Sequence, residues 1–197
     1  MKRVLLTSIA LTLLALSCAE EEEITPYPEA TSPVNVLKRV EISFNQGDAG
    51  LFDDMLSKAF VFHFDPDDVG QSPPGGSQYD IPETWSETEF RSVIRKMFKS
   101  AYSISLTIPT SSVGEPDPNE PIYKAENINI KLLVMIDEVN GFIADAGYCD
   151  FQFERYEGEE GQESWRLTKW WDRTATCFDG NLSLRPTSLG RVLAIYY

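Results

Sequence analysis

The chain has 197 residues, 42% of them hydrophobic, and a formal net charge of −14 at pH 7. This length suits one globular domain, and the apolar fraction is too high for a disordered acidic tail. A pI of about 4.4 leaves no basic surface to neutralise phosphates, which excludes nucleic acid as a partner. Three cysteines without C-x-x-C spacing and one histidine form neither a zinc finger nor a redox motif, so we expect no metal and no cofactor.

The amino terminus has the pattern of a secretory signal. Lys2 and Arg3 precede an apolar run over residues 4–16. Its 13 residues cover roughly 20 Å as a helix, which is too short for a hydrocarbon core of ~30 Å. The small residue before Cys18 resembles the lipobox of bacterial lipoproteins, which implies that residues 1–17 are removed and that Cys18 carries lipid chains such as palmitate. The alternative is an ordinary signal peptide with an incidental cysteine.

Residues 18–32 are predicted to form a lipidated tether. Four consecutive glutamates, residues 20–23, precede a proline-rich segment that favours an extended, solvated chain. Removing residues 1–17 takes away two positive charges and no negative charge, so the net charge changes from −14 to −16. The glutamates either are simply solvated or resemble the surface-export signal of some Gram-negative lipoproteins. We expect the protein at the bacterial outer membrane, facing the periplasm or the surface, with the lipid at Cys18 as its contact with the membrane.

Residues 33–197 are predicted to form a single domain that begins with helices. Ser32 and Pro33 are typical of a helix start, and apolar residues at four-residue spacing predict a helix over 33–46. Gly47 ends this helix, and Asp48 caps a short second one that reaches residue 56. A short strand over 60–64 and a long loop over 65–83 follow. A capping box over 86–89 then begins a third helix, whose apolar face extends to residue 98.

The second half of the chain reads mainly as strands. A short strand over 103–108 and a loop over 114–121 precede three long strands, over 123–137, 142–156 and 164–173. Turn-like clusters separate these strands at 140–141 and 158–161. Helices followed by antiparallel strands predict an α+β fold, in which N-terminal helices pack on a curved, mainly antiparallel sheet.

Three segments carry a resemblance to the nuclear transport factor 2-like superfamily. They are the first helix with Asn45-Gln46-Gly47-Asp48 at its end, the strand over 60–64, and the strand Trp165-Arg166-Leu167-Thr168-Lys169-Trp170-Trp171-Asp172. The resemblance spans residues 33–173 and implies a cystatin-like, cone-shaped fold. This superfamily includes ketosteroid isomerases, scytalone dehydratase, polyketide-cyclase-like proteins and noncatalytic binding domains, so the resemblance assigns no activity. The loop over 65–83 and the C-terminal extension over 174–197 depart from the family pattern.

Asp145 is the first candidate for acid–base chemistry. A two-residue hairpin at Asn140-Gly141 would set Ile136 opposite Asp145 and Leu132 opposite Cys149 on one apolar face. A carboxylate on such a face either is held as a general base with a raised pKa or lies at the rim of the sheet in water. The sequence leaves both interpretations open.

His63 is the second candidate, since it is the only imidazole in the chain. It alternates with Phe62 and Phe64 and should therefore lie on the opposite face of the strand, as an acid or base or as a structural residue. Asp65, Asp67 and Asp68 follow it, but they lack the spacing of an EF-hand, so we expect a solvated loop without calcium.

Cysteine and aromatic residues suggest two further features. Cys149 and Cys177 could form a disulfide in an oxidising compartment, or Cys149 could pack as a small apolar residue. Four aromatic residues on the predicted strands either line a ligand pocket or pack in the core: Tyr148, Trp165, Trp170 and Trp171.

These observations favour a noncatalytic, lipid-anchored envelope protein that binds a small apolar ligand or an envelope protein. One alternative is an isomerase, dehydratase or cyclase that uses Asp145 or His63 as acid or base in the cone cavity. The other is a structural or dimerising protein, a homodimer formed through the outer face of the sheet. The observation that separates the first two is whether Asp145 and His63 share a cavity, because an enzyme needs convergent polar groups.

Overall fold

The computed structural model describes residues 27–75, 79–157, 162–175 and 184–197. The predicted signal peptide and Cys18 therefore lie outside the described residues, as does Cys177. The elements in chain order are α1 (Pro33–Gln46), α2 (Ala49–Met55), β1 (Leu56–His63), β2 (Thr84–Ser86), α3 (Glu87–Ser100), β3 (Ser103–Thr107), the 3-10 helix η1 (Thr110–Ser112), β4 (Ile122–Ile128), β5 (Lys131–Met135), β6 (Gly141–Ala144), β7 (Ala146–Glu157), β8 (Glu163–Ala175), β9 (Leu184–Pro186) and α4 (Leu189–Ala194). None of the described helices is long and apolar enough to cross a membrane.

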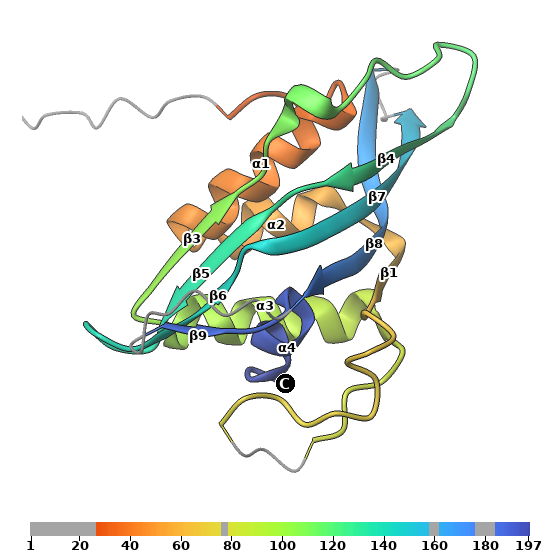
Figure 1. The fold of residues 1–197 in the computed structure, drawn as a ribbon. Helices are drawn as coiled ribbons and strands as arrows, with labels where there is room; N and C mark the ends of the chain where they lie inside the picture. The colour runs from red at the N-terminus through yellow and green to blue at the C-terminus, as the bar shows by residue number, and fades with distance from the viewer. Residues whose placement is uncertain (1–26, 76–78, 158–161, 176–183) are drawn as a thin grey trace, which may run out of the picture.

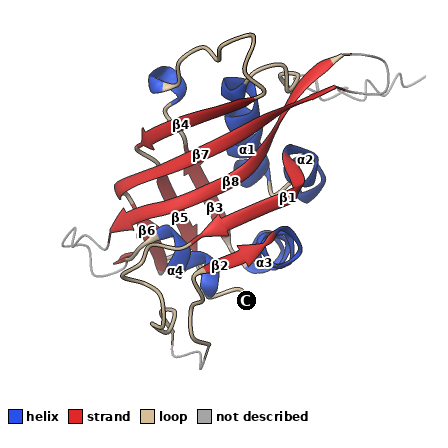
Figure 2. Ribbon diagram, turned by 90° about the vertical axis from the view of Figure 1, so that its right-hand side faces the viewer, coloured by secondary structure: helices blue, strands red, loops and turns tan. Residues whose placement is uncertain are grey.

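The strands form two sheets that continue one another along the molecule (Figure 1). One sheet has five strands in the order β2-β1-β8-β7-β4, and the other has four in the order β3-β5-β6-β9. Pairing is antiparallel except for β1 with β8 and β6 with β9, which are parallel. Figure 2 shows α1, α2 and α3 along one side of the strands. This arrangement confirms the predicted α+β class and is consistent with the cone-shaped fold that the resemblance implied.

The first helix has the bounds that the local sequence predicted, and α3 begins at the predicted capping box, whereas α2 ends one residue earlier than predicted and α4 was not predicted. Ser32 Oγ accepts a hydrogen bond from the Asn35 amide at 3.2 Å, which caps α1. Gly47 ends α1 in the left-handed region at φ 68°, a conformation that costs glycine little. Ser86 and Glu89 form the expected capping box, in which the Glu89 carboxylate accepts from the Ser86 amide at 2.8 Å.

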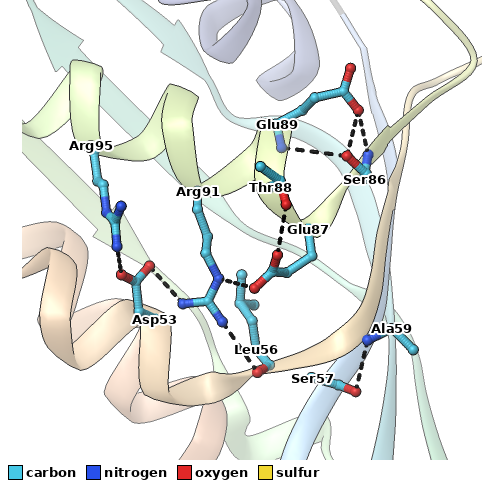
Figure 3. A network of polar contacts seen from close by, with 10 residues as sticks. All are labelled: Asp53, Leu56, Ser57, Ala59, Ser86, Glu87, Thr88, Glu89, Arg91 and Arg95. Atoms are coloured by element: carbon cyan, nitrogen blue, oxygen red, sulfur yellow. Dashed lines mark hydrogen bonds and ion pairs between the residues drawn. The ribbon is translucent and has the colours of Figure 1, made fainter.

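An ion-pair network joins the second and third helices (Figure 3). Asp53 of α2 lies between Arg91 and Arg95 of α3, with Arg91 Nη1 at 2.8 Å from the Asp53 carboxylate. Arg91 also pairs with Glu87 one turn earlier on α3. These residues are partly exposed, so the network orients the two helices more than it stabilises them.

Aromatic side chains fill the space between the helices and the sheet. The rings of Phe62 on β1 and Phe90 on α3 are stacked at 4.8 Å, and Trp170 on β8 meets both rings edge-on. All three side chains are fully buried. The space inside the cone is therefore closely packed by side chains at this level of the sheet.

The two long strands predicted over 123–137 and 142–156 are each divided in two. β4 and β7 pair in one sheet, while β5 and β6 pair in the other. Asn127, at φ 57°, and Gly147, at φ 89°, lie at the bends. Gly147 is needed there, because a Cβ would lie 2.3 Å from the Arg173 carbonyl oxygen. A curved sheet with one buried face requires such bends.

The predicted register of this hairpin is consequently wrong. Leu132 pairs with Ala144 and not with Cys149, while Cys149 pairs with Ile128. Ile136 lies outside β5, so it does not pair with Asp145 as predicted. The turn is longer than the two residues assumed, with the Ile136 amide donating to the Asn140 carbonyl at 2.8 Å. The core cluster takes even-numbered residues from β6 and odd-numbered residues from β7, so the alternation shifts by one residue around Asp145, between the two strands.

Candidate functional site

A cleft of about 730 Å³ opens where two parallel strands separate. The ladder between β1 and β8 ends with the pair His63 and Trp171, after which the chain leaves β1 and runs over the end of the sheet. Ligand sites often form at the carboxyl ends of parallel strands, where the chains diverge. The cleft is lined by His63, Phe64, Asp65, Pro66, Val69, Glu83, Thr84, Trp171, Asp172 and Arg173.

His63 and Trp171 form one wall of the cleft. Their rings are stacked, with centroids 5.1 Å apart and an interplanar angle of 14°. Among the described residues, the buried His63 Nε2 has no hydrogen-bond partner. Burial, with the nearby Lys169 charge as a second cause, lowers the pKa of His63, so the imidazole is neutral at pH 7.

Asp172 lines the same cleft, but its carboxylate is engaged by the protein. It accepts hydrogen bonds from the Thr174 amide at 2.9 Å, the Thr174 hydroxyl at 2.6 Å and the Gly190 amide at 2.6 Å. The residue is only 1% exposed, and this burial raises the pKa of Asp172 to about 7, with a smaller contribution from the Asp68 charge. Gly190 permits the approach, since a Cβ there would be 2.9 Å from the carboxylate.

Asp68 and Ser188 complete the attachment of the last helix. The Ser188 hydroxyl donates to the Asp68 carboxylate and accepts from the Arg191 amide, and so caps α4. Asp68 is buried, and this burial raises its pKa. The expectation that residues 65–68 are a solvated loop is therefore wrong at Asp68. The hydrogen bond to Ser188, 120 residues later in the chain, draws that carboxylate inside.

Asp145 lies apart from this cleft. It sits between β6 and β7 with its side chain 31% exposed, and Lys131 Nζ is 3.6 Å from the carboxylate. His63 lines the cleft and Asp145 does not. The structure thus brings His63 into one lining with Asp65, Glu83 and Asp172 but leaves the other predicted acid–base residue, Asp145, outside it, between β6 and β7.

The predicted aromatic residues have different environments. Trp171 lines the cleft, whereas Trp165 and Trp170 are buried in the core and Tyr148 is 48% exposed. Cys149 is fully buried, and burial raises the pKa of its thiol well above the ordinary value. Its pairing with Cys177 stays a prediction, because Cys177 lies outside the described residues.

Sequence reasoning did not single out Asp172 or Ser188. Alternation along β8 places Asp172 on the same inward face as Trp170, which was the available signal for a buried carboxylate. Nothing local identified Ser188, whose partner comes from a distant loop. Within the described ranges, no three His, Cys, Asp or Glu side chains are grouped so that they could hold a metal ion.

Comparisons with known proteins add no activity. No family model and no curated protein matches the chain. Among solved structures, the chain is similar to a protein from Kribbella flavida at 13% identity, covering 82% of this chain and 93% of that one with a TM-score of 0.48. AusH from Aspergillus nidulans is 15% identical, covering 76% and 86% with a TM-score of 0.44. The chain named Rd1NTF2_04 with long sheet is 7% identical, covering 69% and 94% with a TM-score of 0.38. The fold assignment accordingly rests on the topology described above.

Proposed function

We propose that this protein is a lipid-anchored binding domain of the bacterial cell envelope, and that it binds a small ligand without catalysing its conversion. The observation that carries the proposal is the cleft at the end of β1 and β8, with its aromatic wall and the polar residues Asp65, Glu83 and Thr84 in its lining. Small-molecule sites combine apolar walls with a few polar groups that orient the ligand. Phe64, Pro66 and Val69 supply the apolar part.

The same geometry disfavours acid–base catalysis. A general base must reach the substrate, but Asp172 is 1% exposed and its oxygens are held by three hydrogen bonds from β8 and α4. Asp145 does not line the cleft and is paired with Lys131. His63 Nε2 has no hydrogen-bond partner within the described ranges but is buried, so it offers no accessible nitrogen to a substrate in the cleft.

Ligand binding is tested with a library of fluorinated aromatic fragments, screened against the full mature chain by ¹⁹F NMR. Fragments that bind should lose affinity for Trp171→Ala by about tenfold, because stacking on the ring is lost. Tyr156→Ala removes an exposed aromatic residue away from the cleft and should change nothing. Fragments that bind wild type and Trp171→Ala equally, or a library without binders, would contradict the proposal.

The anchor is supported by the sequence around Cys18 and is tested separately. Cells labelled with a palmitate analogue should incorporate it into the wild-type protein. Cys18→Ala should abolish the labelling and release the protein from membranes, because the lipid chains supply the membrane affinity. Unchanged labelling and membrane association of this variant would overturn the lipoprotein assignment.

A further inference from the structure

An apolar tip lies at one end of the four-stranded sheet. Seven large hydrophobic side chains are exposed in the described part of the chain, and three of them form this tip: Tyr102 at 61%, Ile136 at 51% and Val139 at 60%. Tyr102 lies between α3 and β3, and the other two lie in the turn between β5 and β6. Figure 1 shows this turn extending beyond the end of α3. A group of exposed apolar side chains indicates a contact surface, whereas single ones need no explanation.

Backbone hydrogen bonds place the members of the tip beside one another. The ladder between β3 and β5 ends at Met135, whose carbonyl accepts from the Tyr102 amide at 2.8 Å. Tyr102 and Ile136 are therefore each one residue beyond the last pair of two adjacent strands. In the turn, the Val139 amide donates to Asp137 Oδ1 at 2.8 Å. The fold thus holds the three side chains at one place.

The same two strands are buried further along. The Leu106 and Leu132 pair and Val134 are at most 1% exposed, and Ile104, which pairs with Val134, is partly buried. The apolar sequence of β3 and β5 continues past the point where the core covers it. Apolar side chains left in water in this way gain free energy when an apolar medium covers them.

Charge does not supply an attraction at the tip. The charged residues within three positions of the tip in the sequence are Lys99, Asp137 and Glu138, one positive and two negative. The Asp137 carboxylate is used within the turn, where it accepts from the Val139 and Asn140 amides at 2.8 and 2.7 Å. Burial of apolar surface is therefore the driving force that the tip offers.

The chain that leads to the predicted lipid anchor reaches the same end of the molecule. Tyr27 is the first described residue, and its hydroxyl donates to Gln46 Oε1 at 3.0 Å, at the end of α1. A Cβ on Gly47 would lie 4.0 Å from the Cβ of Phe98, in the last turn of α3, which leads into the tip. Nine residue steps separate Cys18 from Tyr27, which is at most roughly 30 Å of extended chain. A lipid at Cys18 would keep this end of the domain close to a bilayer.

We propose that the apolar tip inserts into the headgroup region of the phospholipid bilayer that carries the anchor, and that this contact fixes the orientation of the domain on the membrane. The inference rests on the lipid anchor of the proposed function and adds a second contact to it. Tyrosine is enriched at membrane–water interfaces, and isoleucine and valine gain free energy by leaving water. Because the anchor holds the tip at a high local concentration, three side chains are sufficient.

The test places a tryptophan at the tip. Lipidated Tyr102→Trp protein is reconstituted in phosphatidylcholine vesicles, and the wild-type emission is subtracted. Dibrominated phosphatidylcholine should quench about half of the added indole emission, because residues at this depth contact the acyl boundary. Tyr156→Trp changes another exposed tyrosine, on β7 of the five-stranded sheet, and its added emission should not be quenched.

Matched variants test whether apolar burial causes the contact. In the Tyr102→Trp protein, Ile136→Gln should reduce the quenching about twofold. Ile122→Gln alters a similarly exposed isoleucine on β4 and should leave the quenching unchanged. Added salt or phosphatidylglycerol should not increase the quenching, since charge does not drive the insertion. Thermal melts check that each variant is folded.

The outcomes separate the tip from the anchor. Equal quenching of Tyr102→Trp and Tyr156→Trp, or quenching of neither, overturns the insertion, while palmitate labelling decides the anchor independently. Quenching that requires phosphatidylglycerol and disappears in salt also overturns it, in favour of an electrostatic contact. If the unlipidated Cys18→Ala chain sediments as a dimer that Ile136→Gln dissociates, a second copy covers the tip and the membrane contact is overturned. If no lipid is found at Cys18, the anchor and this inference fail together.

Discussion

Two carboxylates near the ends of inner strands, Asp145 and Asp172, have opposite environments. Asp145 lies between β6 and β7, partly exposed, with Lys131 at 3.6 Å. Asp172 lies near the end of β8, 1% exposed, and accepts three hydrogen bonds from groups that the fold brings to it. The apolar pattern around Asp145 made it the conspicuous acid, yet a break in the sheet leaves it in water. Burial of a carboxylate follows from what covers the strand and not from the strand alone.

The largest expected effect is that of removing the buried carboxylate. Asp172→Ala should lower the free energy of unfolding by about 3 kcal/mol, because the buried amides of Thr174 and Gly190 lose their acceptor. Urea denaturation at pH 6 measures this loss. Asp67→Ala, in the exposed part of the loop after β1, serves as the control and should cost less than about 0.5 kcal/mol. Equal losses of stability in the two variants would show that the buried Asp172 carboxylate contributes no more than an exposed one.

The second effect is a pH dependence that only Asp172 should confer. Its pKa is about 7 in the folded protein and 3.8 ordinarily, so between these values the folded state holds a proton that the unfolded state releases. The resulting stability is present below pH 3.8 and is lost as the pH rises through 7.

Between pH 5 and pH 7 this loss amounts to about 2 kcal/mol. It is measured as the difference between the urea profiles of wild type and Asp172→Asn, which cancels contributions from His63 and Asp68. Parallel profiles of the two proteins over this range would show that the Asp172 carboxyl does not titrate there.

A smaller effect is expected at the cap of the last helix. Ser188→Ala should cost about 1.5 kcal/mol, since α4 loses its N-cap and the buried Asp68 loses its donor. Ser188→Thr keeps the hydroxyl and should recover most of this stability. Thermal unfolding of both variants tests whether the hydroxyl itself matters. A threonine variant as unstable as the alanine variant would assign the effect to packing.

The smallest effect is expected at the exposed acid. Asp145→Asn should change the free energy of unfolding by less than about 1 kcal/mol and leave fragment binding intact, because its ion pair with Lys131 is long and solvated. A double-mutant cycle with Lys131→Gln should give a coupling of less than about 0.5 kcal/mol. A coupling several times larger would make Asp145 comparable to Asp172.

Several features of the fold followed directly from the sequence. The bounds of α1, the end at Gly47 and the capping box of Ser86 and Glu89 depend on side chains within a few residues of the backbone groups that they cap. The α+β class followed from the order of helical and alternating patterns. His63 was a candidate from its uniqueness, and the structure places it in the lining of the cleft.

Only the tertiary structure decided which acidic residues are buried and where the cleft lies. The division of the long strands at Asn127 and Gly147 changed the hairpin register, because a curved sheet must bend where its buried face turns. The burial of Asp172 and Asp68 depends on α4, a helix from the end of the chain that packs on β8 and on the loop after β1. Local sequence patterns indicate periodicity and helix caps. They carry no information about contacts between residues that are far apart in the chain, and the two contacts in question span separations of 18 and 120 residues.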